Sequence, residues 1–429
     1  MSVLQTLITK CRFELIKFNM KKIFFLFLYL GILTGFAQAQ TRYDILIKGG
    51  HVVDAKNNIN ELMDVAIQDG KVAAVSKNIS PSLSKQVVNA KGMYVSPGFI
   101  DLHSHVFAGT EINRALSNGD LSVAPDGFTF RSGVTTVVDC GDSGWKSFPT
   151  FKRNIIDKSK TRVLTFLNIV GEGMRGRADY EQNINDFDSK MAANTAIEYK
   201  EHIVGFKLAH FNTFSWVPVQ RVVEAGKLAN VPVIIDLGYP LPLEELFFKY
   251  LRPGDIYTHV FTEAARREPV IDAKTKQLRS FMIPAQKRGI LFDVGFGGGS
   301  FNFNQAIPAI KAGFIPNTIS TDLHTGSMNA GMKDQINVMS TFLAIGLDIQ
   351  GVIIRSTWAP AKAIKREELG NLSVGAIADL ALVSVRNGNF GFRDADGFRI
   401  EGNQRLECEM TIKGGKIVYE LNSITKTNL

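Results

Sequence analysis

Between residues 97 and 371, short β-branched runs alternate with longer segments of helical periodicity, and this alternation restricts the fold more than any other feature. About eight of the runs have the length and composition of buried strands. Strands that alternate with helices form parallel β–α–β units, and about eight such units close into a barrel. The sequence therefore predicts an α/β protein built on a (β/α)8 TIM-type barrel.

The expected strands of the barrel are 94–100, 135–139, 162–169, 203–208, 231–236, 255–259, 290–294 and 318–321. The expected helices are 187–201, 218–229, 243–250, 282–288, 303–312, 332–344 and 360–365. An open doubly wound sheet is the alternative architecture, and its dinucleotide-binding form has a Gly-x-Gly-x-x-Gly turn after the first strand. No such turn follows residues 94–100, so the closed barrel is favoured.

Short runs in which apolar and polar residues alternate mark the two segments that flank this region, 41–96 and 372–422. Asp69-Gly70 and Lys413-Gly414-Gly415 separate such runs and are typical of hairpin turns. Two β segments at opposite ends of a chain can complete one domain. We therefore predict a small discontinuous β-sandwich domain formed by both chain ends, and a barrel domain at 97–371.

Residues 1–39 have the pattern of a targeting segment. Met20-Lys-Lys is followed by an apolar run at 23–33 and by Ala37-Gln-Ala39, which resembles a signal-peptide cleavage site. We expect a cleaved signal peptide, with Met20 as an alternative start, and a mature protein that is periplasmic or secreted. The apolar run is shorter than the ~20 residues that a membrane-spanning helix needs, so no membrane association is expected after cleavage.

The charge balance argues against a nucleic-acid partner. The formal net charge is +8, but residues 1–39 hold five of the 49 basic and one of the 41 acidic residues, which leaves +4 for the remaining chain. No basic cluster follows one predicted face. Cys140 and Cys408 remain after the targeting segment and are interpreted as buried thiols. We expect a small-molecule substrate, and the sequence leaves a homo-oligomer open.

Polar side chains occur at the ends of several predicted strands, which a closed barrel would bring to one rim. His103 and His105 are two residues apart and therefore share one face of a strand. Imidazole is a common ligand of divalent metals. Lys207 lies within an apolar run, where a buried ammonium tends to lose its charge. A neutral amine can take up carbon dioxide and become an anionic carbamate that bridges two metals. The predicted metal ligands are His103, His105, Lys207, Asp236, His259 and Asp322.

Each of these residues also has an ordinary structural interpretation. Asp322 follows a strand, where aspartate commonly caps a helix. His259 is a candidate core histidine, and Lys207 is long enough to extend its ammonium to the rim. All of these interpretations must hold together for the metal site to be absent, so the metal site is favoured.

Several segments make the chain resemble the amidohydrolase superfamily, and most of all its amidohydrolase/deacetylase metallohydrolases, which are close to dihydroorotases. The resemblance covers nearly the whole chain after the targeting segment. Its most specific motifs are Pro97-Gly-Phe-Ile-Asp-Leu-His-Ser-His105 and Ser320-Thr-Asp-Leu-His324. The other segments that carry it are 133–139, 205–207, 252–259 and 292–301.

The resemblance implies two divalent metal ions, with zinc expected and manganese as the alternative. His103, His105 and Asp322 would hold the first ion, and an N6-carboxylated Lys207 would bridge both. The second ion would take the residues of the fifth and sixth strands. Those are usually both histidines in the superfamily, whereas the fifth strand here ends in Asp236. Our hypothesis is that Asp236 still binds the metal and softens its Lewis acidity; the contrary outcome is a site with one metal.

The implied mechanism is attack by a metal-bridging hydroxide on a carbonyl, with Asp322 as the general base. His324 follows the base by two residues and is expected either to contact substrate or to orient Asp322. Loops after the strands should provide the other substrate contacts, and arginines there could hold a carboxylate. The predicted substrate contacts are Ser143, Asn168, Tyr239, Arg267, Gly298 and His324, with Arg266 as a further candidate.

The expected function is that of a metal-dependent hydrolase of an amide (C–N) or ester bond, most of all a deacetylase or deacylase of a small N- or O-acyl compound. One alternative is a cyclic amidohydrolase of the dihydroorotase or hydantoinase type, and the export signal argues against biosynthetic dihydroorotase work. Another is a catalytically impaired binding relative, which the departure at Asp236 motivates and the presence of Lys207 and Asp322 opposes.

Overall fold

The computed structural model describes residues 42–112, 114–175, 180–265 and 267–427, together with short helical stretches within the first 22 residues. The apolar run and the cleavage site of the predicted signal peptide (1–39) lie outside the described residues. No helix in the described part of the chain is long and apolar enough to cross a bilayer.

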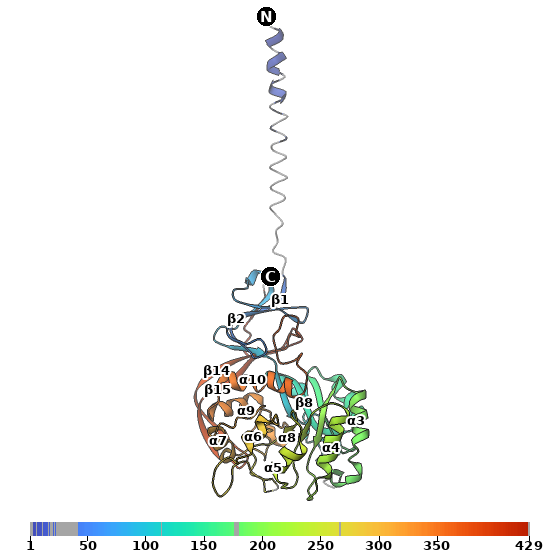
Figure 1. Cartoon of the computed structure of the whole chain (residues 1–429). Coiled ribbons are helices and arrows are strands. Elements are labelled where there is room, and N and C mark those ends of the chain that lie inside the picture. The colour runs from blue at the N-terminus through green and yellow to red at the C-terminus, as the bar shows by residue number, and fades with distance from the viewer. Residues whose placement is uncertain are drawn as a thin grey trace.

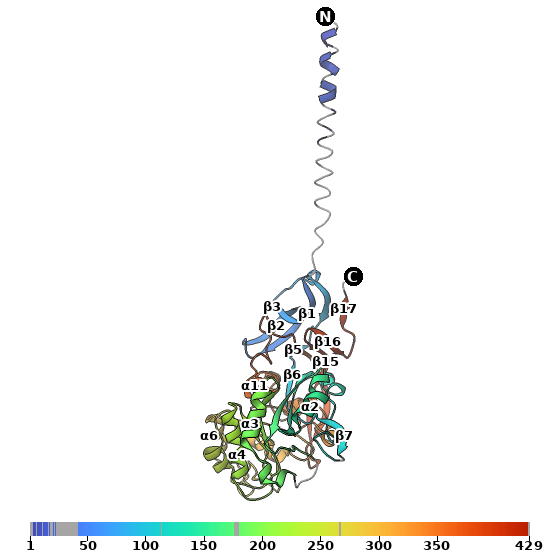
Figure 2. The ribbon, with the colours of Figure 1, turned by 90° about the vertical axis from the view of Figure 1, so that its right-hand side faces the viewer.

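Both ends of the chain contribute to one β domain, as the sequence predicts. Its nine strands form a sheet in the order β16-β15-β14-β5-β1-β2-β3, and β4 pairs with both β1 and β17. Figure 2 shows the strands from the two ends together at one end of the barrel. Both predicted hairpins are present, between β2 and β3 and between β15 and β16. The strands are β1 (Tyr43–Asp54), β2 (Ile59–Gln68), β3 (Lys71–Ser76), β4 (Ser84–Asn89), β5 (Tyr94–Pro97), β14 (Leu380–Arg393), β15 (Arg399–Lys413), β16 (Lys416–Glu420) and β17 (Thr425–Thr427).

Seven parallel strands follow one another around the barrel in chain order. An eighth segment closes it, because Thr318 bridges Asp293 after β13 and Leu323 bridges Ser104 on β6. The predicted (β/α)8 barrel with a flanking β domain is therefore confirmed (Figure 1). The strands are β6 (Phe99–Ser104), β8 (Val134–Gly144), β9 (Arg162–Asn168), β10 (Ile203–Leu208), β11 (Val233–Ile235), β12 (Ile256–Tyr257) and β13 (Leu291–Phe292), and β7 (Ala108–Ile112) lies in the first loop.

The first predicted barrel strand, 94–100, is wrong as a single element. Its first part is β5, which pairs with β1 and β14 in the β domain, and its second part begins β6 of the barrel. Gly98 separates the two strands at a point where a Cβ atom would collide with the Thr135 side chain. The continuous apolar run conceals this change of domain, because both strands are buried.

The helices surround the barrel, and the predicted helical segments agree with them to within a few residues at most ends. They are α2 (Phe148–Asn154), α3 (Ser189–Glu198), α4 (Val217–Leu228), α5 (Leu243–Glu245) with the π-helical turn η7 (Leu246–Tyr250), α6 (Met282–Lys287), α7 (Phe303–Lys311), α8 (Thr325–Met328), α9 (Gln335–Ala344), α10 (Ile349–Ile354) and α11 (Trp358–Ala363). The 3-10 turns are η1 (Pro81–Leu83), η2 (Pro125–Gly127), η3 (Phe130–Ser132), η4 (Ile156–Lys158), η5 (Tyr180–Gln182) and η6 (Ile184–Asp186).

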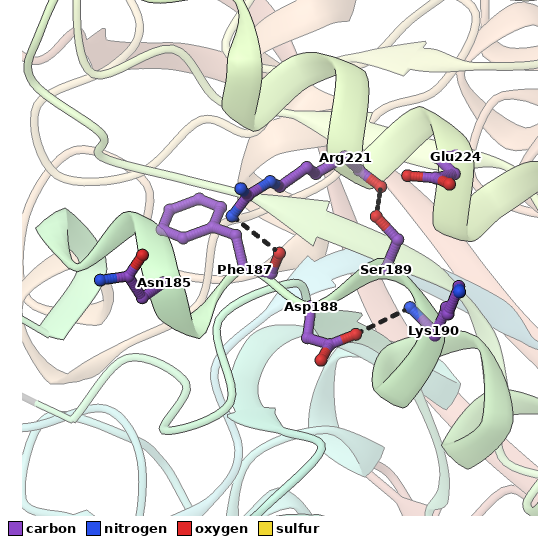
Figure 3. Close-up of a pocket in the computed structure, with 7 residues that line it drawn as sticks. All are labelled: Asn185, Phe187, Asp188, Ser189, Lys190, Arg221 and Glu224. Carbon is purple, nitrogen blue, oxygen red and sulfur yellow. Dashed lines mark hydrogen bonds between the residues drawn. The ribbon is translucent and has the colours of Figure 1, made fainter.

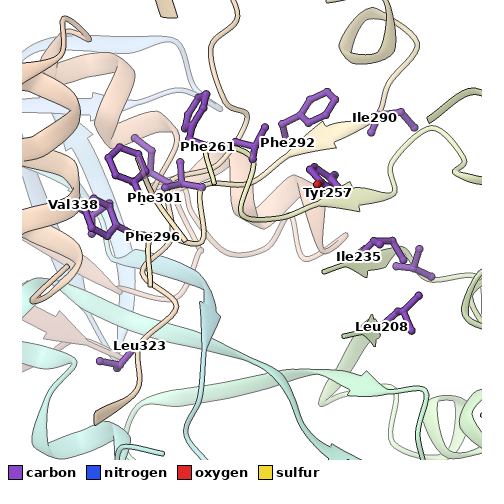
Figure 4. Packing of buried hydrophobic residues seen from close by; sticks show 14 of the residues in the cluster. Leu208, Ile235, Tyr257, Phe261, Ile290, Phe292, Phe296, Phe301, Leu323 and Val338 are labelled. Carbon is purple, nitrogen blue, oxygen red and sulfur yellow. The ribbon is translucent and has the colours of Figure 1, made fainter. Parts of the chain in front are cut away.

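Two apolar layers fix the barrel strands and their ends. Outside the barrel, aromatic rings pack between strands and helices, and Figure 4 shows Phe261, Phe292 and Phe301 within this cluster. Inside it, alternate strand residues such as Val138 and Phe166 form a separate buried cluster. Cys140 belongs to this inner cluster, whereas Cys408 lies on β15, and both are buried free thiols as predicted.

Candidate metal centre

The predicted metal ligands lie together at the C-terminal ends of the barrel strands. His103 is on β6 and Lys207 on β10, and the others follow a strand within two residues or lie in the closing segment. All are buried, and Lys207 has no exposed surface. Its Nζ atom is 3.4 Å from Nε2 of His103, and the Asp322 carboxylate is 2.9 Å from Nε2 of His105. The convergence on which the sequence argument depends is therefore present.

His103, His105 and Asp322 form a compact donor cluster. Asp322 Oδ1 is 2.9 Å from Nε2 of His105 and 3.6 Å from Nε2 of His103. One ligand atom from each residue lies within 4.8 Å of the other two, which is close enough for all three to bind one ion. Two imidazoles and a carboxylate are ligands that zinc accepts.

Hydrogen bonds at the far side of each imidazole fix which nitrogen faces the cluster. Nδ1 of His105 lies 2.6 Å from Asp142 Oδ1. Nδ1 of His103 lies 2.9 Å from the Thr258 hydroxyl, which itself donates to Asp293. Both Nδ1 atoms therefore donate, and the Nε2 lone pairs point toward Asp322. Metal-binding histidines in proteins are commonly oriented by such a second partner.

Repulsion between the acceptor atoms of the cluster favours a bound cation among them. An Nε2 lone pair and a carboxylate oxygen 2.9 Å apart repel each other unless a proton or a metal lies between them. Burial lowers the pKa of His105, but Asp142 and Asp322 outweigh burial and raise it to about 10. Burial raises the pKa of Asp322, but His103 and the neighbouring imidazoles outweigh it and hold the pKa below its ordinary value. A divalent ion would satisfy the same carboxylates.

A second group of donors surrounds Asp236. Its Oδ2 atom is 3.3 Å from Nε2 of His259, 3.5 Å from Nε2 of His210 and 3.6 Å from Nζ of Lys207. His259 donates from Nδ1 to the Gly295 carbonyl at 2.6 Å, so its Nε2 lone pair faces the group. Lys207 therefore lies between the two donor groups.

Sequence reasoning missed His210. It lies three residues after Lys207, just beyond the end of β10, in a segment that gives no metal-binding motif by itself. The available signal was its place after a strand that carries a predicted ligand. Its backbone has φ 55°, and His259 and Asp322 share this left-handed conformation at 57° and 54°. Non-glycine residues rarely adopt it, and such strain is concentrated at functional sites.

The prediction that Arg267 could hold a substrate carboxylate is not supported by its position. Arg267 is buried and donates from Nη2 to Asp236 Oδ1 and from Nε to the Leu237 carbonyl. Only Nη1 has no hydrogen-bond partner in the described part of the chain. The sequence could not show this pairing because the two residues are 31 positions apart. Arg266 lies outside the described residues.

Two other predicted substrate contacts, Asn168 and His324, have hydrogen-bond partners within the chain. Asn168 donates to the Gly141 carbonyl and accepts from the Val170 amide. Nδ1 of His324 accepts from the Gly326 and Ser327 amides, so this residue caps α8. Its ring centroid lies 6.2 Å from that of His105, so it is still next to the site. A neutral His324 carries its proton on Nε2, which can donate to a ligand.

The remaining predicted contacts are Ser143, Tyr239 and Gly298. The buried Ser143 hydroxyl has no hydrogen-bond partner among the described residues. Tyr239 lines a small pocket together with Asp236. A Cβ atom on Gly298 would lie 3.8 Å from Cε1 of His324.

A larger crevice of about 330 Å³ lies elsewhere, between the N-terminal end of α3 and helix α4. Figure 3 shows that Arg221, which lines this crevice, is turned toward the Phe187 carbonyl. The guanidinium also contacts the Ile184 carbonyl, and the Arg221 carbonyl accepts from Ser189. These bonds join the helix to the turn before α3, so the crevice is a structural junction.

Two glycines make space for the site. Gly141 has φ 93°, and a Cβ atom there would lie 2.7 Å from Cγ of Lys207. Gly297 has φ 61°, and a Cβ atom there would collide with Oδ2 of Asp322. The absence of a side chain at Gly297 therefore leaves room for the Asp322 carboxylate.

Gly141→Ala should lower the free energy of unfolding by about 1–3 kcal/mol and displace Lys207, because it combines backbone strain with a collision. Gly92 is a matched control: its φ is 81°, but an added Cβ atom would meet nothing within 4 Å. Gly92→Ala should cost about 1 kcal/mol of backbone strain only. Urea denaturation measures both variants. Equal losses would show that Lys207 does not depend on the space at Gly141.

Comparisons with known proteins agree with this geometry. No protein-family model matches the chain. A deacetylase of Brucella anthropi is 32% identical over 357 residues, which cover 82% of this chain and 86% of the relative. The chain belongs to the amidohydrolase superfamily. A deacetylase of Agrobacterium fabrum is 33% identical over 335 residues, which cover 77% of this amidohydrolase and 80% of the relative.

Solved structures lead to the same superfamily. An adenine deaminase superposes with a TM-score of 0.80 and 27% identity, over 88% of this amidohydrolase and all of that chain. A dihydroorotase superposes with a TM-score of 0.76 and 28% identity, over 87% and 98% of the two chains. The protein is thus an enzyme of the metal-dependent amidohydrolase class, which acts on carbon–nitrogen bonds. The donor cluster fits the divalent metals typical of that superfamily.

Proposed function

We propose that this amidohydrolase removes the acyl group from a small N- or O-acyl compound. The observation that carries the hydrolytic part is the buried cluster of His103, His105 and Asp322, in which a carboxylate lies beside two metal-competent imidazoles. The choice of an acyl substrate rests on the two relatives named deacetylases, each of which matches more than three quarters of the chain. The proposed partner is a small molecule.

The proposed cofactor is a pair of divalent ions, zinc first and manganese as the alternative. His103, His105 and Asp322 would hold one ion, and Asp236 and His259 the other. Lys207, as its N6-carboxylate, would bridge them. Its position supports this, because Nζ lies 3.4 Å from His103 and 3.6 Å from Asp236, one residue in each donor group.

Carboxylation of Lys207 requires a neutral amine, and the neighbouring groups oppose it in the metal-free protein. Burial lowers the pKa of Lys207, but the Cys140 sulfur and the Asp236 and Asp322 carboxylates outweigh burial and raise it. Metal ions would compete for the same carboxylates.

In the proposed reaction, Asp322 transfers the proton and His324 binds the substrate. When bound, the metal ions supply Lewis acidity, which lowers the pKa of a water molecule and polarises the scissile carbonyl. Asp322 is positioned to accept the proton of the attacking water and to return it to the leaving nitrogen or oxygen. His324 can donate from Nε2 to the substrate, because its Nδ1 is occupied by backbone amides.

A substrate panel tests the proposed reaction against its alternative. The similarity to a solved dihydroorotase favours ring opening of a cyclic amide as the second candidate. The panel contains N-acylated amino acids, acylated hydroxy acids, dihydroorotate and hydantoins. We expect the best acyl compound to exceed every cyclic amide by at least about 100-fold in kcat/KM. Ring opening as the faster reaction would overturn the deacylase proposal. No turnover of any compound would favour a binding relative.

We also propose that the enzyme is exported, on the basis of the basic and apolar pattern in residues 1–39. The mature protein would then begin near Gln40. Fractionation of producing cells and N-terminal sequencing test this proposal. An uncleaved protein that stays in the cytoplasm would contradict it.

A further inference from the structure

The second donor group contains one imidazole more than the predicted ligands provide. The resemblance to the superfamily implies histidines at the ends of both the fifth and the sixth strand, and here the fifth provides Asp236. His210, which follows the fourth strand, points Nε2 at Asp236 Oδ2 from 3.5 Å, and His259 points Nε2 at the same oxygen from 3.3 Å. A second imidazole is thus present in this donor group, and it comes from the loop that follows the neighbouring strand, β10.

The hydrogen bonds of His210 match those of a metal ligand. Nδ1 lies 3.1 Å from Glu181 Oε2, so the carboxylate accepts from Nδ1 and the Nε2 lone pair is left free. That lone pair faces a carboxylate oxygen, as the His259 lone pair does. Asp236 Oδ2 and the Nε2 atoms of His210 and His259 are three potential ligand atoms for one cation, and the Lys207 ammonium faces the same oxygen from 3.6 Å in the metal-free protein. Glu181 is buried, and it would orient His210 as Asp142 orients His105.

Arg267 explains how the site tolerates an aspartate where a histidine is usual. An aspartate adds one negative charge to the second donor group, and the buried Arg267 guanidinium returns one positive charge at the other carboxylate oxygen, Oδ1. The pair of Asp236 and Arg267 is therefore neutral in sum, as an unprotonated histidine is. Oδ2 remains free to face the two imidazoles.

We propose that His210 is a ligand of the second metal ion, oriented by Glu181, and that Asp236, neutralised by Arg267, binds the same ion through Oδ2. This proposal rests on the proposed metal-dependent function. In this proposal, the imidazole that is absent from the fifth strand is replaced by His210 in the loop after β10. The bridging Lys207 is on β10 itself.

Metal content tests the proposal without any need for a substrate. Wild-type enzyme saturated with zinc and freed of excess metal should contain about two ions per chain, and His210→Ala about one, because His103, His105 and Asp322 are intact. His202→Ala is the matched control, since His202 lies just before β10 at the opposite end of the same strand. It should keep both ions. A cobalt titration followed by visible absorption should show two binding phases for wild type and one for His210→Ala.

Glu181 provides a graded second test. Glu181→Ala should weaken the second cobalt phase by about 10–100-fold, since orienting partners of metal ligands contribute that much affinity. Glu181→Gln keeps an oxygen that can accept from Nδ1, so its loss should be smaller.

The outcomes separate this proposal from the proposed function. A His210→Ala enzyme that keeps two ions with unchanged affinity, and changes only KM, would make His210 a substrate contact and overturn the proposal. A wild-type enzyme with one ion and chelator-sensitive turnover would also overturn it while leaving the hydrolase function intact. Loss of one ion in His210→Ala would support the proposal even if no acyl compound were turned over.

Discussion

Asp322→Asn should lower kcat for the best acyl substrate by about 10²–10⁴-fold, because asparagine keeps the shape of the side chain but cannot accept a proton. Its oxygen would still face His105, from which Asp322 Oδ1 is 2.9 Å away. The tight contact that Gly297 permits leaves little room for another rotamer. Because Asp322 is also a proposed ligand, kcat must be measured at saturating zinc and with metal content determined in parallel.

Asp334→Asn is the matched control for that substitution. Asp334 lies twelve residues further along the chain and caps α9 by accepting from the Asn337 amide. Asparagine caps helices as well as aspartate does, so this variant should keep wild-type kcat. If Asp322→Asn stays within a few-fold of wild type with its metal bound, another group must be the base.

Lys207→Met should reduce turnover by at least about 10³-fold and lower the metal content, because methionine fills the same space but cannot form a carbamate. Lys207 is completely buried and lies between the two donor groups, so its loss removes the residue that is proposed to join them. Metal analysis and turnover at saturating zinc measure both effects. Near-normal metal content and turnover in Lys207→Met would show that Lys207 has only a structural role.

Lys207→Ala separates the role of the carbamate from that of packing. Alanine leaves a space beside Gly141, where the Lys207 side chain now packs. A short carboxylate such as acetate or propionate could occupy this space and replace the carbamate. We expect added carboxylate to restore part of the activity of Lys207→Ala and none of that of Lys207→Met. Equal responses of the two variants would argue against a carbamate.

The sequence predicted the convergence of the ligands because that convergence follows from periodicity. Two histidines at i and i+2 share a strand face, and the C-terminal ends of barrel strands share a rim. Lys207, Asp236, His259 and Asp322 could then be assigned to one place from strand order alone. The same argument predicted the β domain from both ends of the chain, since the alternation at 41–96 and 372–422 is local.

Other features of the site depend on contacts that no local pattern encodes. Arg267 reaches Asp236 from 31 residues away, and Lys207 packs on Gly141 from the second strand after it. His210 is directed toward Asp236 by a left-handed backbone and by Glu181, which lies 29 residues earlier. His324 was expected to meet substrate or orient Asp322, but its cap on α8 depends on the path of the chain after the strand.

The metal dependence of hydrolysis tests the central claim most directly. Turnover of the best acyl substrate should be measured before chelation, after chelation and dialysis, and after stepwise return of zinc or manganese. The account predicts that activity falls with the metal content and returns as ions rebind, with Asp322→Asn at least about 100-fold slower than wild type throughout. Full turnover by an enzyme from which metal analysis finds all ions removed would contradict it.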